Sequence, residues 1–191
     1  MNSRITPIIV CLFFFSILLT SCVSSRGFNA HGEFITSKLE MKVPRGEEFQ
    51  GADKINGVVR MYKSDFIRIS FRAPVVRSEM FVIEYTKSQL VLVNRMNKMY
   101  SVVPIDELES LQQRGIHLLS FEEMESLFKQ AVLSRSSRRL TSHQLGLDVL
   151  PASKIELSKF SNAVFKSDSL KIPNRYVQVD VLEFYDNLFK N

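Results

Sequence analysis

Hydrophobic and polar residues alternate along much of the first half of the chain. In the stretch DFIRISFRA, Ile67, Ile69 and Phe71 fall on one side of an extended strand and polar residues fall on the other. This period of two is typical of a strand with one buried face. Short polar turns separate about six stretches of this kind, so we expect residues 32–103 to form an antiparallel meander.

Two stretches in the middle of this region are apolar on both sides. EMFVIEY and QLVLVN place hydrophobic residues at successive positions rather than at alternate ones. A strand with this composition is buried on both faces, so the predicted sheet needs a covering layer on each side of its centre.

The period becomes helical after residue 103. Asp106 with Glu109, and Ser120 with Glu123, have the spacing of capping boxes, which mark helix starts. The second box opens an apolar stripe formed by Phe121, Met124, Leu127, Phe128, Ala131 and Val132. Such a stripe fits a helix packed on the sheet as part of a closed core, and it also fits a lid over a cavity.

The remaining third of the chain returns to strand-like patterns. The polar and basic stretch SRSSRRLTSHQLG fits a loop or an edge strand. Two or three strands follow, which are KIELSKF and RYVQVDVLEFY with AVFKSDSLKI as the optional third. In RYVQVDVLEFY, Val177, Val179 and Val181 alternate with polar residues. The predicted layout is six strands, two helices and three strands, which is an α+β domain with one long antiparallel sheet.

The N-terminus has the pattern of a secretory signal. Arg4 precedes an apolar run from Ile5 to Leu19, which is shorter than the roughly 20 residues that cross a bilayer. The next residues complete the sequence LTSC, which resembles the bacterial lipobox. This resemblance implies cleavage before Cys22 and acylation of its thiol. An ordinary signal peptide with a chance cysteine, or an uncleaved helical anchor, are the alternatives.

The predicted organisation is therefore a signal peptide at residues 1–21, a flexible tether at 22–31 and one domain at 32–191. Cleavage removes Cys11, and acylation occupies Cys22, so the mature chain has no disulfide and no thiol nucleophile. Val23 follows the cysteine and no acidic run comes after it. We therefore expect an outer-membrane lipoprotein that is anchored by its acyl groups and faces the periplasm.

The net charge and the absence of known motifs argue against several classes of function. The mature chain carries 24 basic and 20 acidic residues, an excess that is too mild to predict nucleic-acid binding. The three histidines are isolated from one another in the sequence and fit no zinc motif, and no catalytic or nucleotide-binding motif occurs. We therefore expect a non-enzymatic protein without a metal ion or a cofactor.

Two short segments are candidates for contact with a membrane. Arg135, Arg138 and Arg139 form a basic cluster that fits either anionic lipid contact or a solvated loop. Val75 and Val76 follow a proline at a strand junction, where they form either a buried turn or an apolar tip that touches the bilayer.

Four stretches resemble a family of uncharacterised bacterial lipoproteins whose fold is related to the lipoprotein carrier LolA and its receptor LolB. They are INGVVRMYKSDFIRISFRAP, VLVNRMNKMYSV, SFEEMESLFKQAVL and IPNRYVQVDV, and the most specific piece is LVNRMNKMY. The chain departs from the family after Pro74, where Val75-Val76-Arg77 replaces a glycine-containing turn. It also lacks a further strand near its end, which implies a shortened sheet.

This resemblance implies a curved antiparallel sheet that forms an incomplete β-barrel covered by helices, with an apolar interior able to hold acyl chains. The implied function is binding of lipid or of an acylated lipoprotein during lipid or lipoprotein trafficking. The residues expected to line the interior are Leu39, Met41, Ile67, Ile69, Phe71, Phe81, Ile83, Leu90, Leu92, Phe121, Met124, Leu127 and Phe128. The same residues also fit a closed core, and a structural lipoprotein that docks a protein partner without a ligand is the alternative function.

Overall fold

The computed structural model describes residues 28–42, 54–72, 78–134, 138–145, 153–168 and 170–187. The predictions that concern the signal peptide, Cys22, Val75, Val76 and Arg135 lie outside these residues.

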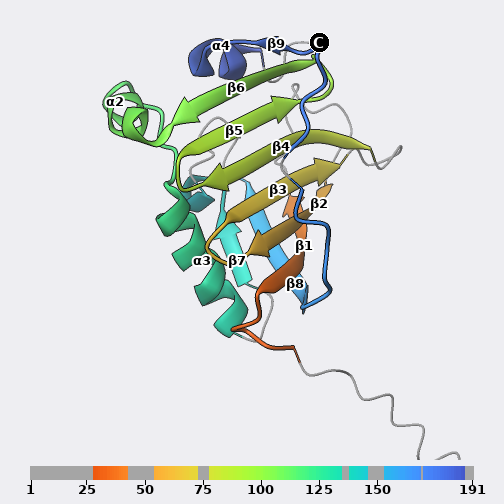
Figure 1. Cartoon of the computed structure of the whole chain (residues 1–191). Coiled ribbons are helices and arrows are strands. Elements are labelled where there is room, and N and C mark those ends of the chain that lie inside the picture. The colour runs from red at the N-terminus through yellow and green to blue at the C-terminus, as the bar shows by residue number, and fades with distance from the viewer. Residues whose placement is uncertain are drawn as a thin grey trace, which may run out of the picture.

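One open sheet organises the described residues (Figure 1). Its strands are β1 (Phe34–Lys42), β2 (Lys54–Tyr62), β3 (Phe66–Arg72), β4 (Glu79–Thr86), β5 (Gln89–Asn94), β6 (Met99–Pro104), β7 (Arg138–Thr141), β8 (Lys154–Ser161) and β9 (Val177–Gln178). They lie in the order β7-β8-β1-β2-β3-β4-β5-β6-β9. Neighbouring strands are antiparallel except β6 and β9, which are parallel.

The helices are short. They are η1 (Ile105–Glu107), α2 (Leu108–Gln113), α3 (Phe121–Leu133), η2 (His143–Leu145) and α4 (Val181–Asp186). The described part of the chain is therefore mostly β, with one largely antiparallel sheet of nine strands and a few helices. The prediction of one long sheet is confirmed in that the sheet is single and largely antiparallel, and the predicted six-strand meander is present as β1–β6. The predicted α+β class is corrected to mostly β, because the helices are few and short.

The prediction of strands near the C-terminus was only partly right. The stretch AVFKSDSLKI contains no strand among its described residues, and only Val177 and Gln178 of the following stretch join the sheet. From Val181 the chain is helical, because the Asp180 side chain accepts a hydrogen bond from the backbone N–H of Leu182 at 2.8 Å. This N-cap begins α4 in a stretch whose valine alternation had predicted a strand.

The two predicted capping boxes also had different outcomes. Ser120 and Glu123 form both reciprocal hydrogen bonds, at 2.8 and 3.2 Å, and start α3 as predicted. The prediction of a capping box at Asp106 was wrong, since α2 begins after Glu107 without a side-chain cap. The chain leaves β6 through the 3-10 turn η1 at Pro104, and this turn places Asp106 inside η1 rather than at a helix start.

Two features of the strands favour curvature of the sheet. The pairing register shifts between Phe71 and Arg72 opposite β4, and between Thr36 and Lys38 opposite β8. Such bulges increase local twist. In β2, a Cβ atom on the buried Gly57 would lie 2.5 Å from the carbonyl oxygen of Ser70, so only glycine lets β2 and β3 approach this closely.

Each face of the sheet has its own cover. The inner face carries the main apolar core, on which α3 lies against β3 and β4, and α4 lies against β6. The outer face is crossed by residues 162–168 and 170–176, here called the crossing segment, which lie between β8 and β9 in front of the central strands (Figure 1). The prediction that the central strands need cover on both sides is therefore confirmed.

Candidate functional site

The structure places the predicted interior residues together on the inner face of the sheet. All belong to one apolar cluster, in which each is buried except Leu127, which is partly buried. The members are Leu39, Met41, Ile67, Ile69, Phe71, Phe81, Ile83, Leu90, Leu92, Phe121, Met124, Leu127 and Phe128. They meet because alternate residues of each strand point to the same face of the sheet, and the stripe of α3 turns toward that face.

Helix α4 adds side chains to this cluster that the sequence reasoning missed. Val181, Phe184 and Tyr185 are buried there, and the ring centroids of Phe184 and Phe81 lie 5.8 Å apart. Asp180 and Glu183 have the spacing of a capping box. This spacing could have identified the helix, but the alternating valines at 177, 179 and 181 favoured a strand instead.

The inner face also contains polar atoms. The Tyr85 side chain is 1% exposed, and its hydroxyl has no hydrogen-bond partner among the described residues. The Ser37 hydroxyl on β1 is likewise buried without a partner in that part of the chain. Burial raises the pKa of Tyr85, and the neighbouring Tyr185 adds to this effect, so the Tyr85 phenol stays neutral and remains a hydrogen-bond donor.

A partly buried arginine on β3, Arg68, holds the crossing segment on the outer face. The Arg68 side chain forms an ion pair with Glu84 on β4, in which Nε donates to Oε2 at 2.6 Å. Its Nη2 atom donates to the carbonyl oxygen of Asp168 at 2.7 Å, and its guanidinium lies over the Phe66 ring. This arginine therefore ties the crossing segment to the sheet.

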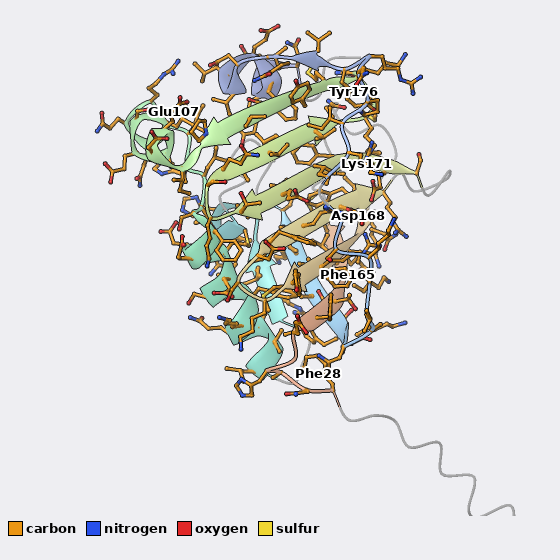
Figure 2. All side chains as sticks on the ribbon, viewed as in Figure 1. Phe28, Glu107, Phe165, Asp168, Lys171 and Tyr176 are labelled. Carbon is orange, nitrogen blue, oxygen red and sulfur yellow. The ribbon has the colours of Figure 1, made fainter. Side chains whose placement is uncertain are left out.

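Apolar contacts hold the rest of the crossing segment. Phe165 packs edge-on against Phe34 and Phe66. Further along, Leu170, Ile172 and Tyr176 pack on the buried valines of β4 and β5. Figure 2 shows Phe165, Asp168, Lys171 and Tyr176 in sequence along this segment, which keeps the outer face from water.

Described residues line hollows at two places that the predicted interior residues do not line. One, of about 320 Å³, lies at the outer edge of β6 between Glu107 and residues 178–181. The other, of about 180 Å³, lies between residues 30–32, Met61, Lys63, Lys129 and Leu133.

The candidate membrane-contact residues are only partly described. Arg139 is exposed on β7, and Arg138 is the first residue of this strand.

Elsewhere the basic side chains are interspersed with acidic ones. Glu40, for example, pairs with Lys54 at 3.0 Å, and this hydrogen bond lowers the pKa of the Glu40 carboxyl.

The histidines and acidic groups do not form a metal site in the described part of the chain. His117 and His143, which are far apart in sequence, have ring centroids 6.5 Å apart, but the described residues contain no group of three or more potential ligands among His, Cys, Asp and Glu. Among the same residues, no helix has the length and hydrophobicity needed to cross a membrane.

Comparison of the sequence with protein-family models and with curated proteins finds no match.

Proposed function

We propose that this protein is a non-enzymatic lipoprotein, anchored in the outer membrane by acyl groups on Cys22 and facing the periplasm, whose interior binds lipid or the acylated end of another lipoprotein. In this proposal the open sheet is the incomplete barrel of a LolA- or LolB-like fold, and α3 and α4 cover it. The observation that carries the proposal is the single apolar cluster between one face of an unclosed sheet and these short helices.

The geometry supports a site of this kind because the cover is thin. The helix α3 lies against β3 and β4, α4 lies against β6, and Leu111 of α2 also packs on the cluster, so short helices provide much of the cover on this face. An acyl chain that enters beneath them gains about 0.8 kcal/mol for each methylene buried. Such binding depends on buried area rather than on directional contacts, so it tolerates many acyl ligands.

Fluorescent fatty-acid titration of the soluble domain lacking Cys22 tests the proposal. We expect saturable uptake that palmitate displaces. Ile83→Phe, which adds volume on the inner face, lowers this uptake because it fills space that the ligand needs. Ile83 is fully buried on β4.

Val82→Phe is the matched control, because Val82 is equally buried on the same strand and belongs to the cluster on the outer face. It is expected to reduce stability by about 1–3 kcal/mol through overpacking and to leave uptake by the folded fraction unchanged. Absence of saturable uptake by the unsubstituted domain, or equal loss of uptake in both variants, would count against an acyl site on the inner face.

A second candidate function is docking of a protein partner without a ligand. The hollow at the edge of β6 favours it. Strand β9 accompanies β6 only at Met99 and Tyr100, where the Val179 N–H donates to the Tyr100 carbonyl at 2.9 Å. Backbone groups of alternate residues point to the same side of a strand, so those of Val102 face the hollow and could pair with an added strand.

In-cell photo-crosslinking separates the two functions. A photoreactive residue at Gln178, which lines this hollow, forms one defined protein adduct if the edge docks a partner. The same group at exposed Lys171 on the crossing segment is the control. Adducts at neither position, together with acyl uptake, would favour the lipid-binding function.

A further inference from the structure

One end of the molecule is fixed to the residues that follow the predicted anchor. The backbone N–H of Asn29 donates to the Asn162 side chain at 2.6 Å, and the Asn162 amide donates back to the carbonyl of Asn29 at 2.9 Å. Asn162 also donates to the Phe34 carbonyl at 2.9 Å. The last residues of the predicted tether are thus tied to the start of β1 and the end of β8.

Aromatic contacts extend this attachment to the helix on the inner face. The Phe28 ring lies 5.8 Å from the Phe160 ring, and the Phe160 ring lies 6.2 Å from that of Phe128 on α3. Figure 2 shows Phe28 at the extremity of the described structure. We call this extremity the anchor end and define its surface by Phe28, Lys63, Lys129, Leu133 and Val164.

The anchor end exposes large apolar side chains to solvent. Phe28 is 36% exposed, Leu133 at the end of α3 is 58% exposed, and Val164, two residues after Asn162, is 79% exposed. The described residues contain only two other exposed side chains of this kind, Met96 and Val177. Apolar groups in such a position lower their free energy by leaving water for a bilayer interface.

Chain length restricts how far this end lies from the bilayer. Five residues separate Cys22 from Phe28, so the chain between their Cα atoms spans at most about 20 Å when fully extended. Strand β9 lies six strand positions from β1, or about 29 Å across the sheet. An acyl group on Cys22 therefore holds the anchor end close to lipid, and the width of the sheet allows β9 to lie far from it.

We propose that the anchor end rests in the interface of the phospholipid bilayer, with Phe28, Leu133 and Val164 at the boundary between head groups and acyl chains and with β9 and α4 directed away. This inference rests on the acylation of Cys22 in the proposed function, and it adds a fixed orientation. The interior and the edge of β6 then face the periplasm, where a lipid carrier or a partner protein has access to them.

The contact is mainly apolar. Lys129 is already paired with Glu125 at 2.9 Å, and Lys63 lies next to Glu33, whose carbonyl accepts its backbone N–H at 2.9 Å. Both lysines can extend their amines toward phosphates, but the Glu125 carboxylate offsets the charge of Lys129. Binding of the anchor end therefore does not require anionic lipid.

The absence of tryptophan from the chain permits a direct test. Phe28→Trp, Leu133→Trp and Val177→Trp each give the full-length acylated protein a single fluorophore. Each protein is reconstituted into phosphatidylcholine vesicles that carry bromine on the upper acyl chain, and flotation confirms its attachment. Because interfacial side chains enter the bilayer by about 5–10 Å, we expect quenching of about half or more at positions 28 and 133.

Val177→Trp is the matched control, because Val177 is 64% exposed on β9. It is expected to keep its fluorescence, and adding phosphatidylglycerol to the vesicles is expected to change none of the three results. Equal quenching at all positions, or none at 28 and 133 in protein that floats, would overturn the orientation and leave the anchor intact. Failure to float would refute the acyl anchor, and with it this inference.

Discussion

At the scale of single residues, the inner face contains a buried tyrosine hydroxyl, that of Tyr85. Stability measurements can test its role in the folded protein without a ligand. Tyr85 is buried among apolar side chains, and its hydroxyl has no partner within the described residues. A buried polar group without a partner costs about 1–3 kcal/mol. A ligand with a carbonyl or carboxyl oxygen would supply the missing acceptor.

Replacing Tyr85 with Phe is expected to keep or slightly raise the free energy of unfolding at neutral pH, and to remove an alkaline destabilisation. Burial raises the pKa of the folded-state phenol above its ordinary value of 10.0. Above about pH 10 the unfolded chain therefore loses a proton that the folded chain keeps. Stability then falls by up to about 1.4 kcal/mol per pH unit from this group, a loss absent in the variant.

Urea unfolding of both proteins between about pH 8 and 11 measures how their free energies of unfolding change with pH. This range brackets the ordinary pKa of tyrosine. The raised pKa of Tyr62, which comes from its hydrogen bond with Glu33, is common to both proteins and cancels in the comparison. Parallel pH profiles, or a variant destabilised by several kcal/mol at neutral pH, would show that the hydroxyl has a partner when folded.

At the scale of secondary-structure elements, local hydrogen bonds decide where the helices begin. Ser120→Ala removes the side chain that accepts from the Glu123 N–H, so we expect a loss of about 1 kcal/mol in the free energy of unfolding. Asp106→Ala is the control, because Asp106 has the spacing of a cap but η1 has no side-chain cap bond. Its effect should stay within about 0.5 kcal/mol in the same urea titration, and equal losses would contradict these assignments.

The ion pair under the crossing segment is a second element with a measurable contribution. Arg68→Met leaves the Glu84 carboxylate buried without its partner, which costs about 3–5 kcal/mol. The double variant Arg68→Met with Glu84→Leu should recover much of this loss because no buried charge remains. Thermal unfolding of the two single variants and the double variant measures the coupling, and purely additive effects would mean that Arg68 and Glu84 do not stabilise each other.

The alternation of apolar and polar residues correctly predicted strands that bury one side, such as β3 with Ile67, Ile69 and Phe71. It failed at α4, where the Asp180 cap is a local signal that competes with the valine pattern. The grouping of the interior residues could be predicted because alternate residues of a strand share a face, which fixed the apolar side in β1 and β3 and left β4 and β5 apolar on both sides. The positions of Phe165 and Asp168 over the sheet depend on contacts with β1 and β3 that are distant in sequence, and no local pattern specifies these.

At the scale of the whole molecule, the sheet separates three surfaces. The anchor end lies beside β1 and β8, the apolar cluster lies under α3 and α4, and the hollow at β6 lies near the opposite edge. In the proposed orientation the first contacts lipid and the third is directed away from it. A ligand that leaves the interior can therefore pass between a partner on the periplasmic side and the bilayer without detachment of the acyl anchor.

The most direct test of this account is native mass spectrometry of the full-length protein, extracted from membranes in mild detergent and then stripped of the detergent in the gas phase. The account predicts a chain that begins at an acylated Cys22 and carries, in addition, a non-covalent mass that matches one lipid or fatty acid and disappears on unfolding. A chain with no bound acyl molecule, both as isolated and after incubation with palmitate, would contradict the central claim that the inner face of the sheet binds acyl chains.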